Sequence, residues 1–225
     1  MSKELYAFDN KFRKQRKIDL ICGIDEVARG CWAGPIVAAA VILNSDYVIQ
    51  GLNDSKKLND ITRKSLDNDI KQNAITWGIA EISPEKIDKH GLTWANKKVM
   101  VLAAESALNK INLNIDDIKL FIIDQSPCTE LVPQIMIPKA DSTSASVAAA
   151  SIIAKNYRDS IIQEYSCQYP NYKFDEHNGY INPTHIDVVN KYGLIPGVHR
   201  KSYIVSGYNK PKQINLMDFF DENNN

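Results

Sequence analysis

Four acidic residues stand where predicted buried elements end or begin: Asp25, Glu26, Asp124 and Asp141. Carboxylates that converge in a region of low dielectric repel one another unless cations balance them, so such a cluster implies bound metal. Oxygen ligands without a neighbouring His or Cys set favour Mg²⁺ or Mn²⁺ over Zn²⁺. The chemistry that these residue types allow is therefore that of a hard divalent cation held by carboxylates.

The same acids also have simpler interpretations. Asp124 or Asp141 taken alone is consistent with an acid that ends a strand or caps a helix. Asp25 and Glu26 are adjacent, and adjacent residues of a regular strand point to opposite faces of a sheet. They can share one site only if the strand ends or bulges there. The turn-prone segment 30–35 that follows them makes such an irregularity plausible.

The elements that would position these acids follow from apolar periodicity and from capping residues. Strands are expected at 20–26, 36–43, 74–82, 119–124 and 135–138. Helices are expected at 59–73, from Ser83, from a cap at Thr93 to about Lys110, from a cap at Ser142 or Ser144 to about Tyr165, and at 184–192. Strands interleaved with helices predict an α/β domain whose acids lie at the ends of core elements.

Composition narrows the class of protein. A chain of 225 residues with 44% apolar and 24% charged residues is sufficient for one α/β domain and unlike a disordered or collagenous chain. Basic and acidic residues both number 27, so any affinity for nucleic acid must come from local patches. The basic candidates are 11–17, 56–57 and 199–201, each of which could instead be a solvated face.

The four cysteines predict a reducing environment. Cys22, Cys31, Cys128 and Cys167 lack CxxC spacing, and we interpret them as reduced packing residues. No charged-then-apolar signal segment opens the chain, and the longest apolar stretch, 33–43, is too short to span a bilayer. We therefore expect a monomeric, cytoplasmic protein without a membrane partner, located in the nucleus or at replication sites if the host is eukaryotic.

Four blocks of sequence resemble one enzyme family. The segment 23–43, GIDEVARGCWAGPIVAAAVIL, closely resembles the signature opening of ribonuclease HII. Three further blocks match in the same order: DSKKL at 54–58, KAD at 139–141 leading into 146–159, and Gly179-Tyr180 followed by His185 and His199-Arg200. The resemblance spans residues 19 to 206.

The resemblance implies both a fold and an activity. The fold is an RNase H-like α/β fold over 1–206, with a mixed five-stranded sheet flanked by helices and a small C-terminal helical region. The activity is hydrolysis of the RNA strand of RNA–DNA hybrids and cutting 5′ of ribonucleotides embedded in duplex DNA. Two Mn²⁺ or Mg²⁺ ions would give 5′-phosphate and 3′-hydroxyl ends, and the biological role would be ribonucleotide excision and RNA primer removal. The catalytic, metal-binding carboxylates would be Asp25, Glu26, Asp124 and Asp141.

The resemblance also implies residues that recognise the substrate. Backbone groups of Ala28, Arg29 and Gly30 would contact the ribose 2′-hydroxyl, the group that distinguishes RNA from DNA at a given site. Lys56 would contact phosphate, and Tyr180 would stack on the neighbouring sugar. Ala28 departs from the family's usual glycine. If this position needs a positive φ or close approach of the backbone, the added methyl group strains or shifts the loop.

The C-terminal end carries a second motif. The composition changes at Gly207, and we interpret 207–225 as a flexible tail. Within it, QINLMDFF at 213–220 fits the pattern of peptides that bind the PCNA sliding clamp. The clamp-binding residues would be Gln213, Leu216, Phe219 and Phe220, the last three of which would lie on one helical turn. These apolar residues could instead pack on the protein's own core.

Other functions remain alternatives. A ribonuclease HIII-like enzyme shares the acidic core but usually carries an added N-terminal domain. A hybrid-binding module without catalysis would not need all four carboxylates. A small-molecule α/β enzyme would be expected to carry a signature such as GxGxxG or GxxxxGK[ST], and the sequence contains neither.

Overall fold

The computed structural model describes residues 2–124 and 127–209. The strands of this part are β1 (Cys22–Val27), β2 (Ile36–Leu43), β3 (Ala74–Ile82), β4 (Phe121–Ile123) and β5 (Gln134–Met136). The α-helices are α1 (Ser2–Arg16), α2 (Asp60–Asn73), α3 (Pro84–His90), α4 (Leu92–Leu108), α5 (Ala145–Gln168), α6 (Phe174–His177) and α7 (Pro183–Tyr192).

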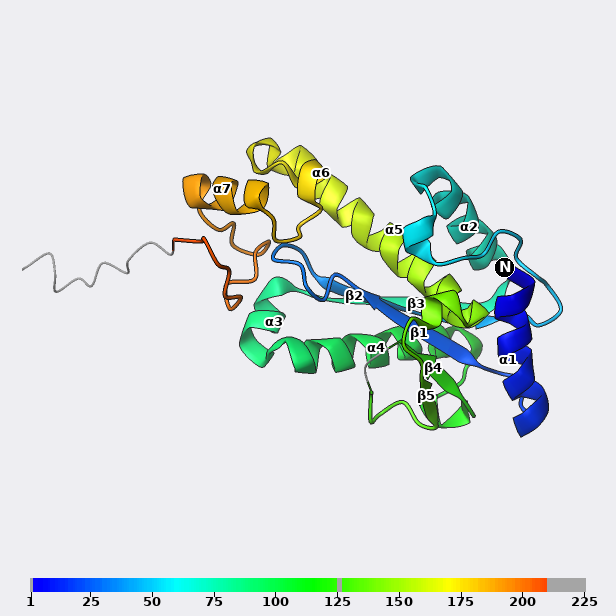
Figure 1. Ribbon diagram of the computed structural model, residues 1–225. Coiled ribbons are helices and arrows are strands. Elements are labelled where there is room, and N and C mark those ends of the chain that lie inside the picture. The colour runs from blue at the N-terminus through cyan, green and yellow to red at the C-terminus, as the bar shows by residue number, and fades with distance from the viewer. Residues whose placement is uncertain (1, 125–126, 210–225) are drawn as a thin grey trace, which may run out of the picture.

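The strands form one mixed sheet in the order β3-β2-β1-β4-β5. β1 pairs antiparallel with β2, and β2 pairs antiparallel with β3. β4 is parallel to both β1 and β5. The expected mixed five-stranded α/β sheet flanked by helices is therefore confirmed (Figure 1).

Helices cover both faces of this sheet. α5, with α2 beside it, lies over one face, and α3 and α4 lie over the other (Figure 1). β2 shows how the sequence produces this arrangement: Val37, Ala39 and Val41 pack with α5, whereas Ala38 and Ala40 pack with α4. Every residue of β2 is buried, which is the pattern of a central strand covered on both sides.

The ends of the helices follow local capping chemistry in part. Ser144 caps α5, because its side chain accepts a hydrogen bond from Val147 N, which decides between the two expected serines. The expected cap at Thr93 is wrong. α4 begins at Leu92 after Gly91, whose φ is +85°, and no side chain caps it. Gly91 is both the last cap of α3 and the first cap of α4. The turn between the two helices therefore requires a residue that adopts a positive φ, and no capping side chain is present.

Helix α1 was not anticipated from the sequence. Its outer face carries the exposed residues Lys11, Lys14 and Arg16, so this part of the basic segment is on the surface. Its inner face places Asp9, which is fully buried, at the start of α5. There the carboxylate accepts hydrogen bonds from Ser146 N at 2.9 Å and Ser146 Oγ at 2.8 Å. Asp9 therefore caps α5 from another helix, a tertiary contact with no local sequence signal.

The small C-terminal helical region, α6 and α7, lies at the end of α5 that is distant from α1 (Figure 1). His199 and Arg200 are buried here, so the basic run at 199–201 is not a surface patch. His199 Nε2 lies 3.1 Å from His185 Nε2. Both rings pack around Trp32, at 5.8 and 5.0 Å between centroids. Burial lowers the pKa of His185 to about 3 and that of His199 to about 4, so both imidazoles are neutral at physiological pH.

The chain after α7 is described only as far as Asn209. Tyr208 packs edge-on against Trp32 at 5.2 Å between centroids, and Asn209 N donates to Asn190 Oδ1 at 3.0 Å. The predicted clamp-binding residues Gln213, Leu216, Phe219 and Phe220 lie outside the described residues. Within the described part, no helix combines the length and the apolar character that crossing a membrane requires.

Candidate active site

Most of the predicted site residues line one cleft of about 390 Å³. It lies where β1, the following loop and α5 meet the segment before α2. Its walls are formed by Asp25, Glu26, Val27, Ala28, Arg29, Gly30, Ser55, Lys56, Asp124, Ser151, Lys155 and Tyr180. Three of the four predicted carboxylates and all five predicted substrate-binding residues are therefore brought together.

The register of the sheet places two of these carboxylates side by side. β1 and β4 are parallel, with Ile24 opposite Ile123. Continuing that register by one residue brings Asp25 opposite Asp124. β4 ends at Ile123, so the edge of β1 is open from Asp25 onward. The cleft exists because β4 stops while β1 continues.

Asp25 and Glu26 reach the cleft from opposite faces of β1. Asp25 faces α5, where the Ser151 hydroxyl donates a hydrogen bond to it. Glu26 faces α4, where the Asn96 amide donates to it. No bulge separates the two acids, because β1 pairs with β2 without interruption from Gly23 to Val27, and β1 ends one residue beyond Glu26. The neighbouring strand β4 ends earlier, which lets side chains from both faces converge around an open edge.

Asp141 lies beside the cleft rather than on its wall. It sits in the 3-10 turn Ala140–Ser142, where its side chain is 3% exposed. Lys56 Nζ is 3.5 Å from Asp141 Oδ2, and its own side chain is 76% exposed. The same turn contacts a second carboxylate, since Ala140 N donates to Asp124 Oδ1 at 3.2 Å.

The electrostatics of the cleft are those of crowded, partly desolvated acids. Burial, then the charge of Glu26, holds the pKa of Asp25 well above its usual range. Burial and the charge of Asp124 raise the pKa of Glu26 to about 7. Burial also raises the pKa of Asp141, against the lowering effect of Lys56. The carboxylates therefore resist ionising together unless positive charge is supplied.

These residues fit divalent metal. Their donors are carboxylate oxygens, which Mg²⁺ and Mn²⁺ prefer. Among the described side chains, Glu26 Oε2 is a buried oxygen without a hydrogen-bond partner, and a cation would satisfy it. In residues 2–124 and 127–209, no three Asp, Glu, His or Cys side chains already stand in a geometry that could hold a metal ion.

The loop after β1 and the loop carrying Tyr180 both contribute to the wall of the cleft. Trp32 N and Ala33 N both donate to Gly179 O, at 2.9 and 3.1 Å, which joins the two loops. Ala28 has a φ of +67°, so the position where the family usually has glycine does adopt the left-handed conformation. The left-handed conformation is less favourable for alanine than for glycine, by roughly 1 to 2 kcal/mol of conformational free energy. Tyr180 is 43% exposed, so its side chain is accessible to a ligand.

Three polar residues of the cleft wall were not assigned a role from the sequence: Ser55, Ser151 and Lys155. The Ser55 and Ser151 hydroxyls are 2.8 Å apart, and Ser151 in turn holds Asp25. Lys155 follows Ser151 by one turn of α5, a spacing that places both on one helical face. That spacing was visible in the sequence, but nothing local indicated that this face of α5 lies against β1.

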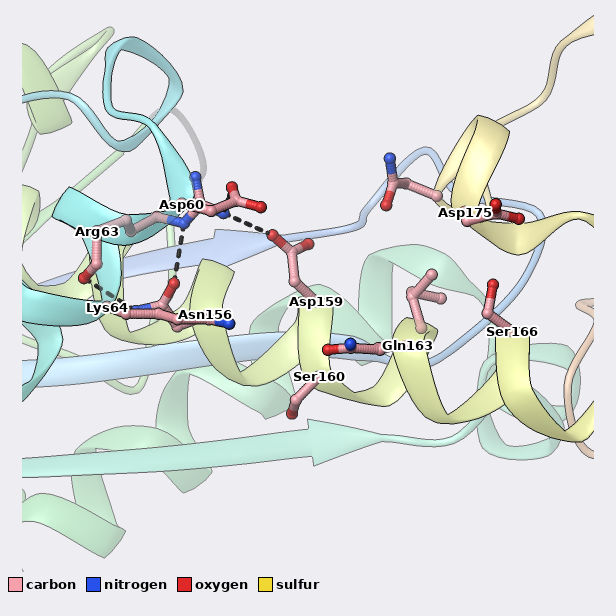
Figure 2. Close-up of a pocket in the computed structure, with 11 residues that line it drawn as sticks. Asp60, Arg63, Lys64, Asn156, Asp159, Ser160, Gln163, Ser166 and Asp175 are labelled. Atoms are coloured by element: carbon pink, nitrogen blue, oxygen red, sulfur yellow. Dashed lines mark hydrogen bonds and ion pairs between the residues drawn. The ribbon is translucent and has the colours of Figure 1, made fainter.

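A second cleft of about 370 Å³ lies along α5 (Figure 2). α5 contributes most of its lining, and Arg63 lies at the end formed by α2 (Figure 2). Arg63 Nη2 pairs with Asp60 at 2.6 Å and with Asp159 at 3.0 Å, and Arg63 Nε donates to Asn156 at 2.9 Å. Since Arg63 is already paired with two carboxylates, this cleft is less suited to a polyanion than the first one.

Comparisons with known proteins identify the family to which the chain belongs. The family model for ribonuclease HII matches residues 22–205. The chain belongs to the ribonuclease HII family. The ribonuclease HII of Clostridium acetobutylicum is 40% identical over 208 residues, which is 90% of this chain and 77% of that protein. That of Idiomarina loihiensis is 40% identical over 185 residues, covering 82% of this chain and 95% of the relative. As a family member, the chain is a ribonuclease H-type endoribonuclease.

Solved structures show the same RNase H-like fold. The ribonuclease H2 of Pyrococcus horikoshii has a TM-score of 0.68 at 22% identity, covering 82% of this chain and 94% of that one. The ribonuclease HII of Archaeoglobus fulgidus, solved in complex with PCNA, has a TM-score of 0.64 at 24% identity, covering 89% and 100%. Bst ribonuclease HIII, solved in complex with Mn²⁺, has a TM-score of 0.65 at 19% identity, covering 82% and 67%. Because the chain belongs to the ribonuclease HII family, the ribonuclease HIII alternative is excluded.

Proposed function

We propose that this chain cuts the RNA strand of RNA–DNA hybrids, and cuts 5′ of single ribonucleotides in duplex DNA, by hydrolysis that depends on two divalent metal ions. The observation that carries the proposal is the cleft in which Asp25, Glu26 and Asp124 meet the 28–30 loop and Tyr180. Acids for metal and groups for a ribose line the same cleft. A binding module without catalysis would have no use for the crowded carboxylates.

Each part of the cleft has a task in this proposal. The cations would be held by four carboxylates: Asp25, Glu26, Asp124 and Asp141. Because the negative charges of these groups repel one another, bound cations would stabilise them. Lys56, mostly exposed and tethered to Asp141, can contact a substrate phosphate. When bound, Mg²⁺ or Mn²⁺ would supply an activated water and stabilise charge on the leaving 3′ oxygen. The Mn²⁺ seen in Bst ribonuclease HIII supports this class of metal at the shared fold.

The proposal is tested with two duplexes. One carries a long labelled RNA strand on DNA, and the other is DNA with a single ribonucleotide. Each is incubated with the protein and either Mg²⁺, Mn²⁺ or EDTA. We expect cutting of both duplexes with either metal and none with EDTA, while an all-DNA duplex stays intact. Cutting of all-DNA duplex, or of hybrids in EDTA, would contradict the proposal.

The stacking role of Tyr180 gives a prediction of its own. Tyr180→Phe keeps the ring and should retain most cutting at a single ribonucleotide, whereas Tyr180→Ala should lose on the order of tenfold, because ring contacts contribute about 1 kcal/mol or more. Long hybrids, which offer many sites, should be affected less. The measurement is kcat/KM on both duplexes. Equal activity of the Phe and Ala variants at a single ribonucleotide would exclude stacking.

We further propose that the tail binds a sliding clamp of the PCNA type. Leu216, Phe219 and Phe220 would fill an apolar pocket, each burial being worth roughly 1.5 to 3 kcal/mol before the cost of ordering the tail. The complex of the Archaeoglobus fulgidus enzyme with PCNA supports this kind of partner for the family. Localisation at replicating DNA would follow from such binding.

The clamp proposal predicts separable functions. Truncation after Asn209 keeps the packing of Tyr208 on Trp32 and should leave cutting of short hybrids unchanged. The same truncation should abolish clamp binding, as should Phe219→Ala combined with Phe220→Ala, from a starting affinity of roughly micromolar Kd. The affinity is measured by titration calorimetry of peptide 212–222 against the host's own clamp. No heat of binding, or unfolding of the truncated enzyme, would mean that these aromatics serve the enzyme's own fold.

A further inference from the structure

Arg200 is a fully buried arginine whose partners lie in the loop after β1. Its guanidinium donates from Nη2 to Ala28 O at 2.7 Å, from Nη1 to Arg29 O at 2.8 Å and from Nε to Gly34 O at 3.0 Å. Its backbone N also donates, to Trp32 O, at 2.8 Å. One residue from the C-terminal region thus holds four carbonyls of a loop that lies far from it in sequence.

These contacts fix the direction of the loop's amides. In a planar trans peptide, the carbonyl and the N–H of the next residue point in opposite directions. Because the Ala28 and Arg29 carbonyls point inward to Arg200, the N–H groups of Arg29 and Gly30 point away from it. Ala28, Arg29 and Gly30 line the catalytic cleft. Two successive amides facing a cleft from a turn with one left-handed residue can receive a ligand oxygen.

A second donor supports the same carbonyl. The Tyr203 hydroxyl accepts from Arg200 Nη1 at 2.7 Å and donates to Arg29 O at 2.7 Å. Arg29 O therefore has two donors, and its peptide plane is held from two directions. This support matters because Ala28 is an alanine with a φ of +67°, a conformation that the residue does not favour by itself. The strained loop is stabilised by its neighbours rather than by its own sequence.

General stabilisation of the fold is the simpler explanation for Arg200, but it does not account for the choice of residue. Taking a guanidinium out of water is costly, and apolar residues of similar size often stabilise a core as well or better. A planar group with several fixed donors is needed only where several carbonyls must be held in one arrangement.

We propose that Arg200, assisted by Tyr203, is a positioning residue for ribose recognition: it turns the amides of Arg29 and Gly30 toward the cleft. The proposal rests on the proposed function, because the ligand oxygen is taken to be that of a ribose in the substrate. Arg200 itself does not touch the substrate and acts through the loop.

The test uses two variants and a matched control. Tyr203→Phe removes one hydroxyl and keeps the ring, and Arg200→Lys keeps the charge but loses the planar set of donors. The control is Arg63→Lys, at another buried arginine, whose partners are Asp60, Asn156 and Asp159 (Figure 2). Circular dichroism establishes which variants are folded.

The first measurement is the ratio of two affinities. Anisotropy, with Ca²⁺ replacing Mg²⁺ to hold the duplex uncut, compares DNA containing one ribonucleotide with the same duplex made entirely of DNA. Tyr203→Phe should reduce the preference for the ribonucleotide by about fivefold, as expected for one hydrogen bond, and Arg200→Lys by about tenfold or more. Arg63→Lys should keep the wild-type ratio. A purely structural role would lower both affinities and leave the ratio unchanged.

The second measurement needs no substrate. In ¹H–¹⁵N spectra, the amide resonances of Arg29 and Gly30 should shift or broaden in Tyr203→Phe and stay in place in Arg63→Lys. Unchanged amides together with an unchanged affinity ratio in folded Tyr203→Phe would overturn the positioning role. A wild-type enzyme without preference for the ribonucleotide, but with shifted loop amides in the variants, would instead overturn the proposed recognition of ribose.

Discussion

Asp25→Asn is expected to reduce cleavage by roughly 10³-fold or more, because a lost metal ligand removes several kcal/mol of transition-state stabilisation and about 4 kcal/mol corresponds to that factor. The fold should survive the change. Asparagine has the same shape as aspartate, and its Oδ1 can still accept from Glu26 N, which now lies 2.9 Å from Asp25 Oδ1. Single-turnover cutting of a labelled hybrid with Mg²⁺ measures the effect.

The same variant should raise the melting temperature of the metal-free protein. Burial and the charge of Glu26 hold the pKa of Asp25 above its usual range, which means that its ionised form opposes folding at neutral pH. A group whose pKa is raised by folding loses its stabilising contribution as the pH rises, so the gain from asparagine should be larger at pH 8 than at pH 5. Asp67→Asn, at an acid paired with Lys71 on α2, is the control and should keep full activity. Near wild-type cutting by folded Asp25→Asn would refute the assignment of the site.

Gly23→Ala is expected to destabilise the protein by about 3 kcal/mol or more, at the upper end of the range for overpacked cores. A Cβ at this position would lie 2.3 Å from Ser146 C and 2.5 Å from Val147 N, both backbone atoms of the first turn of α5. Such atoms cannot move without displacing the helix from β1. For a chain of this length, the loss corresponds to a fall in melting temperature of about 6 to 12 °C.

Activity should fall together with stability in this variant. α5 carries Ser151, which holds Asp25, so a displaced helix also displaces the carboxylate. Gly30→Ala is the matched control for stability, because nothing lies within 4 Å of a Cβ built there. The measurement is the melting temperature of each variant. A melting temperature of Gly23→Ala equal to that of the wild type would contradict the close packing of α5 on β1.

The parts of the fold that the sequence predicted are those with strong local patterns. β2 and β3 begin and end where alternation or an unbroken β-branched run predicted them, at 36–43 and 74–82. α2 begins after Asn59, whose side chain accepts from Thr62 N, a capping pattern that can be recognised from the sequence. The four site carboxylates came from the resemblance, since strand-end acids by themselves allowed simpler interpretations.

The parts that could not be predicted depend on contacts between distant segments. α1 is held by Asp9 at the start of α5, 137 residues away. The convergence of Asp25 and Glu26 depends on where β4 ends, which neither residue's neighbours encode. His199 and Arg200 were candidates for a basic surface patch, but both are buried, and Arg200 supports the loop after β1. In each case tertiary packing outweighed the local pattern.

The chemistry of the cut tests the central claim most directly. DNA duplex with one ribonucleotide, labelled at both ends of the cut strand, is incubated with the enzyme in Mg²⁺ and the new ends are mapped. If the carboxylates hold Mg²⁺ and the ion supplies an activated water, hydrolysis on the 5′ side of the ribonucleotide would give a 3′-hydroxyl upstream and a 5′-phosphate on the ribonucleotide, with no product in EDTA. A 2′,3′-cyclic phosphate, or a cut that persists in EDTA, would contradict a metal-dependent carboxylate site.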